Sequence, residues 1–316
     1  MRTGITYTTT AGNVLLSMGL CCLIILLFLS CKSEDPVEVE DVPGLGGDIW
    51  AASPIDKWIM DSLTVPYNIS AKYKWDQFEF PNLTKVLVPP DESKVVPLLS
   101  AIRKAWTVPY VQEAGPIFYN QFSPKFFVLS GSNEYNLDGS VTLGIAEGGR
   151  KVVLFGVNLF KIKGMAGYDP QKDSSFVKDW FLHTIHHEFG HILHQTVLYP
   201  IEFTLVTKSL YQGGNWINWT DEQARQNGFI TAYSSFNYNE DFVEMIAMML
   251  TEGKVGFDKI VNNIPAGVSE RGTTQEQAKA ALRMKESIVV GYYRKTWNID
   301  FYSLQNRVRA SMNQLF

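Results

Sequence analysis

The histidines of this chain form a metal-binding pattern. All five fall between His183 and His194, and the run His-Glu-Phe-Gly-His from His187 to His191 matches H-E-x-x-H. On a helix, positions i and i+4 point to the same side, so two such imidazoles can hold one Zn²⁺ at about 2.0–2.1 Å. Glu188 would then lie beside the metal, where it can take a proton from a water. The pattern predicts a zinc hydrolase.

A catalytic zinc needs a third protein ligand and one open position. The ligand could be a histidine in the longer pattern H-E-x-x-H-x-x-G-x-x-H, but that pattern requires Gly and His where this chain has His194 and Val197. The alternative is an acidic residue from a later helix. Glu240 is our candidate, with Asp241 and Glu244 as its rivals.

Two further residues near Glu240 have expected roles. Glu244 lies one helical turn after Glu240, and we expect it to accept a hydrogen bond from the distal nitrogen of a ligand histidine. Tyr233 precedes Glu240 by seven residues, in a predicted loop, and could donate to the oxyanion of a tetrahedral intermediate. Tyr238 is a rival for this oxyanion role.

The other three histidines are expected to be structural or to hydrogen-bond the ligands; they are His183, His186 and His194. His183 could instead pair with His187 across one turn, but Thr184 would then occupy the position of the base.

Helices are predicted to carry these residues. Ser175–Leu198 contains no proline and is followed by Pro200, so the histidines fall inside a long helix. Three more helices are predicted, at Glu240–Leu250, Thr273–Trp297 and Asp300–Leu315. The second of these opens with a Thr-x-x-Glu capping box, formed by Thr273 and Glu276.

The first half of the chain has a mixed pattern. Asp91–Trp106 has helical spacing, but Pro97 suggests that the regular helix begins only near that residue. Three strands are predicted, at Lys125–Leu129, Val141–Ile145 and Lys151–Phe155, with the last two forming a hairpin. Val141–Phe155 could offer an edge strand to an extended substrate, or it could be an interior hairpin without that role.

The N-terminal residues of the chain suggest that the protein is exported. Val14–Ser30 is an apolar run of signal-peptide length, and Phe28-Leu29-Ser30-Cys31 resembles a lipobox. We therefore expect a signal peptide at 1–30, lipidation at Cys31, a polar, acidic tether at 31–48 and one catalytic domain at 49–316. An uncleaved membrane anchor is the alternative. Acidic residues just after the cysteine resemble the surface-export signal of Bacteroidetes lipoproteins.

Composition narrows the function classes. The three cysteines all fall at or before Cys31, so the mature domain has no disulfide and no cysteine-ligated metal. The net charge of −4, without a basic cluster, excludes a nucleic-acid-binding role. Residues 49–316 are numerous enough for one large domain or two tightly joined lobes.

The tyrosine and glutamate spacing after HEFGH resembles the catalytic domain of anthrax lethal factor and related zincins. The whole mature chain is similar to the Bacteroidetes family of substrate import-associated zinc metallohydrolase lipoproteins. The residues that carry this similarity are Asp56-Lys-Trp-Ile-Met, Pro66-Tyr-Asn, the lipobox, Leu143–Arg150, His186–His194 and Glu240–Glu244.

This resemblance implies a zincin-like α+β fold. In this fold the zinc helix lies between a mixed N-terminal lobe with a small sheet and a mainly helical C-terminal lobe. It also implies a zinc metallopeptidase, anchored on the outer membrane and exposed at the cell surface. The expected partners are a peptide or protein substrate, a TonB-dependent importer and its surface binding lipoprotein.

Two other readings stay open. One is a non-catalytic lipoprotein that binds glycan or peptide and keeps zinc for structure, although Glu188 argues against it because a structural site has no use for a base. The other is a protease that processes itself or matures a partner. Another divalent metal could also occupy the site in vivo.

Overall fold

Four short strands form the sheet that supports the site. The computed structural model describes residues 52–316 apart from 81, 83, 138, 148 and 149, and the predicted signal peptide, Cys31 and tether lie outside this range. The strands are β1 (Ser70–Lys72), β2 (Phe126–Leu129), β5 (Gly144–Glu147) and β6 (Lys151–Leu154), in the order β1-β2-β6-β5. β1, β2 and β6 are parallel, and β5 runs antiparallel to β6 at the edge.

β6 is buried on both faces because a hydrophobic cluster packs against each face. Val152 and Leu154 join the main core, whereas Val153 packs with Phe80 and Val128 in a smaller cluster on the other face. This explains why the strand is a continuous apolar run and does not alternate with polar residues.

The prediction of one strand at 141–145 was wrong. Val141–Thr142 is β4, which pairs with β3 (Glu134–Tyr135) in a separate two-stranded ladder, and the sheet strand β5 begins only at Gly144. Leu143 is the break between them. Alternation along the chain cannot reveal that neighbouring residues pair with different partners.

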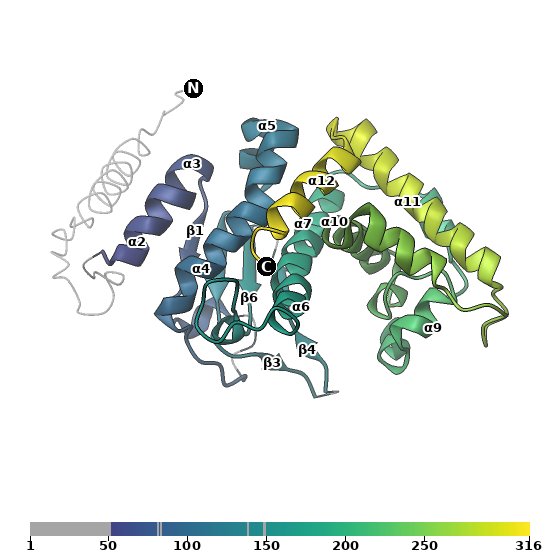
Figure 1. The fold of residues 1–316 in the computed structure, drawn as a ribbon, viewed down its shortest axis with the longest axis horizontal. Helices are drawn as coiled ribbons and strands as arrows, with labels where there is room; N and C mark the ends of the chain where they lie inside the picture. The colour runs from purple at the N-terminus through teal and green to yellow at the C-terminus, as the bar shows by residue number, and fades with distance from the viewer. Residues whose placement is uncertain (1–51, 81, 83, 138, 148–149) are drawn as a thin grey trace, which may run out of the picture. The chain divides into compact units, whose positions relative to one another are not determined.

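Helices of the first half cover one face of the sheet (Figure 1). They are α2 (Pro54–Ile59), α3 (Val65–Tyr67), α4 (Glu92–Ile102) and α5 (Val108–Phe122), with π-helical turns at Met60–Thr64 and Arg103–Thr107 and 3-10 turns at Gln77–Glu79 and Val157–Leu159. The expectation that Pro97 delays the helix was wrong. α4 begins at Glu92, capped by Asp91, and includes Pro97. Burial of Val95 and Leu98, both 0% exposed, offsets the lost backbone hydrogen bond.

The histidines lie in one continuous helical stretch. α6 (Asp173–Val177) passes through a π-helical turn at Lys178–Leu182 into α7 (His183–Thr196). This confirms the long helix predicted at 175–198, apart from its last two residues. Phe181, Ile185 and Phe189 are fully buried, so the side of α7 that carries them is anchored in the core.

The second half is helical, as predicted. Its elements are α8 (Glu202–Val206), α9 (Asp221–Arg225), α10 (Tyr238–Asn262), α11 (Gln275–Trp297) and α12 (Phe301–Met312), with 3-10 turns at Gly213–Asn218 and Tyr233–Ser235. α10 packs against α7 and α12 (Figure 1). It is longer than predicted and bends at Gly253, whose φ of 70° lies in the left-handed region that favours glycine.

The capping box of α11 lies one residue later than predicted. Thr274 is the N-cap, and its side chain and that of Gln277 exchange hydrogen bonds with each other's backbone N–H groups. Thr273 and Glu276 have the same spacing, but the Thr274–Gln277 pair suits a helix that begins at Gln275.

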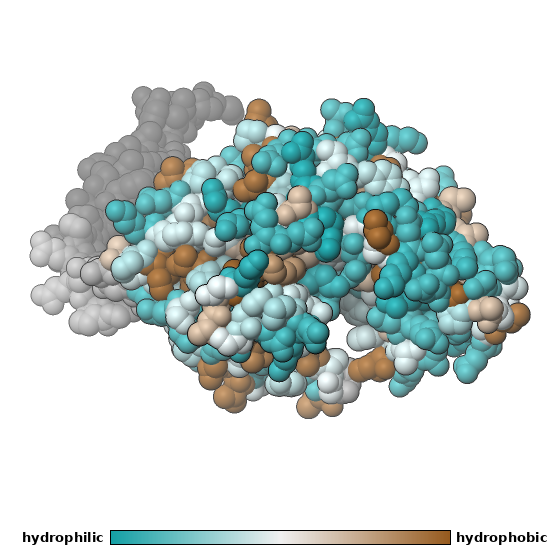
Figure 2. Space-filling model, viewed as in Figure 1, coloured by the Kyte–Doolittle hydropathy of each residue, from teal (hydrophilic) through white to brown (hydrophobic). Residues whose placement is uncertain are grey.

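The described residues thus form a helix-rich α+β structure, which confirms the predicted class. None of the helices within 52–316 is long and apolar enough to cross a membrane. Figure 2 shows a largely hydrophilic surface over the helical half and hydrophobic residues near the β3–β4 hairpin, where Tyr135 and Leu137 are exposed.

Candidate metal centre

Three side chains from α7 and α10 converge on one point. The Nε2 atoms of His187 and His191 each lie 3.2 Å from Oε2 of Glu240. Ligands held at about 2.0–2.1 Å on the corners of a tetrahedron lie about 3.3 Å apart. The donor set and its spacing therefore fit Zn²⁺.

The start of α10 fixes the position of Glu240. Asn237 is the N-cap, and its side-chain oxygen accepts from the backbone N–H groups of Asn239 and Glu240 at 2.8 and 3.0 Å. Glu240 is therefore held in the first turn of the helix, where α10 faces α7.

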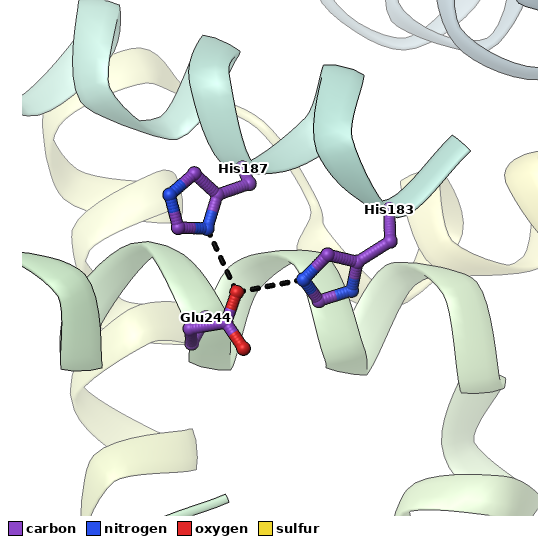
Figure 3. A group of neighbouring side chains, drawn as sticks. All are labelled: His183, His187 and Glu244. Atoms are coloured by element: carbon purple, nitrogen blue, oxygen red, sulfur yellow. Dashed lines mark hydrogen bonds and ion pairs between the residues drawn. The ribbon is translucent and has the colours of Figure 1, made fainter. Parts of the chain in front are cut away.

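Glu244 lies one turn further along α10, behind the ligand histidine (Figure 3). Its Oε1 accepts from Nδ1 of His187 at 2.8 Å and from Nε2 of His183 at 2.7 Å, and its Oε2 accepts from the Thr231 hydroxyl at 2.6 Å. With its Nδ1 hydrogen held by Glu244, His187 can offer the Nε2 lone pair to a metal that displaces the proton of Nε2.

His191 is oriented by a different neighbour. Its Nδ1 lies 3.0 Å from Nε2 of His194. Burial is the main cause that lowers the pKa of His194, to about 4. A neutral His194 can therefore accept from Nδ1 of His191, which again leaves Nε2 to the metal.

His186 has a separate position in the core. Its side chain is fully buried, with its ring 6.0 Å from that of Tyr110. Burial lowers its pKa to about 3, so it is neutral at physiological pH. Of the three remaining histidines, His183 hydrogen-bonds Glu244 and His194 hydrogen-bonds His191. His186 contacts neither and packs in the core.

Asp241, a rival ligand, points away from the histidines. Its Oδ2 lies 2.6 Å from Nζ of Lys285 and accepts from the Tyr211 hydroxyl at 2.8 Å. Lys285 also donates to the carbonyl oxygen of Gly228 and is 0% exposed. This buried ion pair joins α10 to α11, and no short motif indicates it.

Glu188 and Tyr233 line a cavity of about 340 Å³ beside His187. The Tyr233 ring stacks 5.9 Å from that of His187 and packs against Trp216. Burial, followed by the charges of Glu240, Glu244 and Glu188, raises the pKa of Tyr233 well above its ordinary value. Tyr233 therefore keeps its proton and can donate it in a hydrogen bond.

The rival Tyr238 is half exposed and lies outside the residues that line this cavity. Trp216 forms part of the cavity wall with Thr184, Leu143 and Gly144. Nothing in the spacing of these residues indicates the cavity, because they come from segments far apart in the chain.

The edge strand β5 passes close to the histidine helix. A Cβ atom on Gly144 would lie 2.4 Å from Cγ2 of Thr184, so only glycine permits this approach. Within the described residues, the outer edge of β5 has no strand partner, whereas β6 is interior. Of the predicted hairpin, β5 is therefore the strand at the edge of the sheet.

Charges in the centre are strongly coupled when no metal is bound. Burial disfavours the charged forms, but hydrogen bonds between His187 and the carboxylates of Glu240 and Glu244 raise the pKa of His187 to about 10. The pKa of Glu240 falls to about 2, because hydrogen bonds from His187 and His191 outweigh burial. Two carboxylates thus surround a position that favours a cation.

Comparison with known proteins places this chain in a family. No curated protein matches the chain. A crystal structure of a "putative zinc-binding metallo-peptidase" from Bacteroides caccae ATCC 43185 has the same fold, with a TM-score of 0.64 at 24% identity over 84% of this chain and 96% of that chain. Residues 48–302 match the family model Peptidase_Mx1, described as "Putative zinc-binding metallo-peptidase". Since that match spans most of the chain, the protein belongs to this family of zinc-binding metallo-peptidases.

Proposed function

We propose that the protein is a zinc-dependent peptidase in which His187, His191 and Glu240 hold the metal. The observation that carries the proposal is the convergence of two Nε2 atoms and one carboxylate oxygen at 3.2 Å, beside a cavity that Glu188 lines. A purely structural zinc site has a fourth protein ligand and needs no neighbouring base. α7, which carries both histidines, serves as the zinc helix between the sheet and the C-terminal helices, as in zincins with a glutamate ligand.

Each residue of the site has its own role in the proposed reaction. When bound, Zn²⁺ supplies Lewis-acid activation of a water and of the scissile carbonyl. Glu188 removes the proton of the attacking water and returns it to the leaving amine. Tyr233, held as a neutral phenol, donates a hydrogen bond to the developing oxyanion. Glu244 keeps His187 in the tautomer that binds metal.

Zinc content and cleavage of a mixed peptide library test this proposal. We expect one zinc in the wild-type protein and in Glu188→Gln, with cleavage only by the wild type and a loss of about 10²–10⁴-fold in the variant. Zinc in both proteins without cleavage by either would favour a non-catalytic binding lipoprotein or a dedicated protein substrate. Absence of zinc from both would refute the ligand assignment.

We also propose that Cys31 anchors the protein to the outer membrane, with the catalytic domain at the cell surface beside a TonB-dependent importer. Support comes from the apolar run Val14–Ser30 and the lipobox-like residues that end at Cys31. Metabolic labelling with palmitate should mark the wild type and not Cys31→Ala. Protease added to intact cells should digest the domain if it faces outward.

A further inference from the structure

A second, larger cavity adjoins the metal cavity, which is the cavity that His187, Glu188 and Tyr233 line. Its volume is about 760 Å³, and its wall comes from the π-helical turn before α7, from α9 and from the later part of α10. Leu143, His183 and Glu244 line both cavities. Figure 2 shows the surface indented between the β3–β4 hairpin and α9. The two cavities therefore lie next to each other, with residues that support the metal centre at their shared boundary.

The metal cavity alone is small. At about 340 Å³ it lies at the lower end of the range for ligand sites. An extended peptide bound there must continue beyond this cavity, and the larger cavity is its neighbour along Leu143 and His183. Leu143 also immediately precedes Gly144, the first residue of the free edge strand β5, so a chain extended along that edge passes this boundary.

Carboxylates outnumber cations in the wall of the larger cavity. It contains Asp179, Asp221, Glu222, Glu244 and Glu252, but only Lys178, Arg225 and Lys259. Several of these charges cancel, because Lys178 pairs with Asp179 at 3.4 Å and with Glu252, and Arg225 pairs with Asp221 at 3.2 Å.

Apart from Glu244, which is bonded to His183 and His187, one carboxylate charge remains in excess, because the exposed Glu222 and Lys259 offset each other while Lys178 faces two carboxylates. Lys178 is shared between two carboxylates, and the side chain of Glu222 forms no ion pair or hydrogen bond with any residue in the described part of the chain. Lys259 is exposed and faces the same cavity. A cationic group that enters would therefore find acceptors, and an anionic group would meet repulsion.

We infer that the larger cavity is a subsite for a lysine or arginine side chain of an extended peptide, on one side of the bond that the metal centre would cleave. The inference rests on the proposed peptidase function for its substrate class. It rests on the adjacency of the two cavities for its position, and on the charge balance for its preference.

Binding of labelled peptides to the full-length, zinc-loaded Glu188→Gln protein tests the inference without cleavage. Each peptide has an uncharged sequence with one Lys or one Glu, placed at each position in turn, and fluorescence anisotropy gives its Kd. At the position that reaches the subsite, we expect Lys peptides to bind about 5- to 10-fold tighter than Glu peptides, since exposed charges interact weakly and several act together. The preference should shrink in high salt.

Two additional substitutions in the Glu188→Gln background locate the effect. Glu222→Lys should reduce the preference to about 2-fold or less, and Lys259→Glu should increase it. Glu276→Lys is the matched control, because Glu276 is also exposed and occupies the second position of a helix, α11, outside the cavity wall. It should leave the preference unchanged.

No difference between Lys and Glu peptides, equal effects of Glu222→Lys and Glu276→Lys, or no peptide binding would each overturn the inference. Cleavage by the protein with Glu188 intact tests the proposed function separately. Selective binding without cleavage would support the subsite and refute the peptidase, and cleavage without charge preference would do the reverse.

Discussion

Glu244→Gln isolates the contribution of the carboxylate behind His187. The glutamine has nearly the same shape, so its amide oxygen can still accept from His187 and His183 while its NH₂ group faces Thr231, whose hydroxyl can accept in turn. The geometry survives and the negative charge is lost. The change therefore tests electrostatic support of the ligand and not packing.

The expected loss follows from the hydrogen bonds of Glu244. A bond to a charged group contributes about 1.5–3 kcal/mol and a neutral one about 0.5–1.5 kcal/mol, so each of the two bonds to histidine weakens by about 1 kcal/mol. Glu244 is 4% exposed, so solvent screens little of this difference. Only the bond to His187 acts directly on a ligand, which sets the expected rise in zinc Kd at about 5-fold, close to the lower end of the usual range for such residues.

Competition with a chromophoric zinc chelator measures the Kd. Glu252→Gln is the matched control, since it removes a carboxylate from the same helix, two turns further on, where it pairs with Lys178 and not with a histidine. We expect Glu252→Gln to bind zinc like the wild type. A zinc Kd for Glu244→Gln within 2-fold of the wild type, or an equal loss in both variants, would refute the assignment of Glu244.

Four further predictions concern protonation, catalysis and stability. Below its metal-free pKa of about 10, His187 holds a proton that zinc must displace. Calorimetry at pH 7.5 in buffers of different ionisation enthalpy should therefore show about one proton released on zinc binding. The affinity for zinc should also fall as the pH falls. The same raised pKa stabilises the metal-free protein fully below pH 6.5, and this stabilisation should be lost as pH rises through about 10; a flat pH profile of unfolding would contradict it. Tyr233→Phe should lower kcat by about 10²-fold with zinc affinity unchanged, whereas loss of zinc would mean that the ring only packs against His187. Lys285→Met leaves Asp241 buried without its cation and should lower the free energy of unfolding by about 3–5 kcal/mol. Thermal denaturation should show this loss as a fall in Tm of about 10 °C. An unchanged Tm would mean that Asp241 is protonated in the folded protein.

Local sequence patterns sufficed where the physical cause is local. The helix around His187 follows from apolar periodicity and the absence of proline, and the shared side of His187 and His191 follows from helical geometry. The same geometry relates Glu240 to Glu244 on α10. One residue beyond Glu240, Asp241 is rotated by about 100° around the helix, which carries it toward Lys285.

Other features depend on contacts between distant segments. Thr231 and His183 meet at Glu244 only because α7 and α10 pack together, and the split of 141–145 into β4 and β5 depends on which strand each half pairs with. Pro97 fits inside α4 because burial of its neighbours outweighs its local preference. The zinc-binding chemistry and the helix that bears it could be predicted from the chain, since they depend on residue type and on spacing within a turn. Which carboxylate faces the histidines, what supports them and where the cavities lie depend on packing between elements far apart in the chain, so no local pattern could show them.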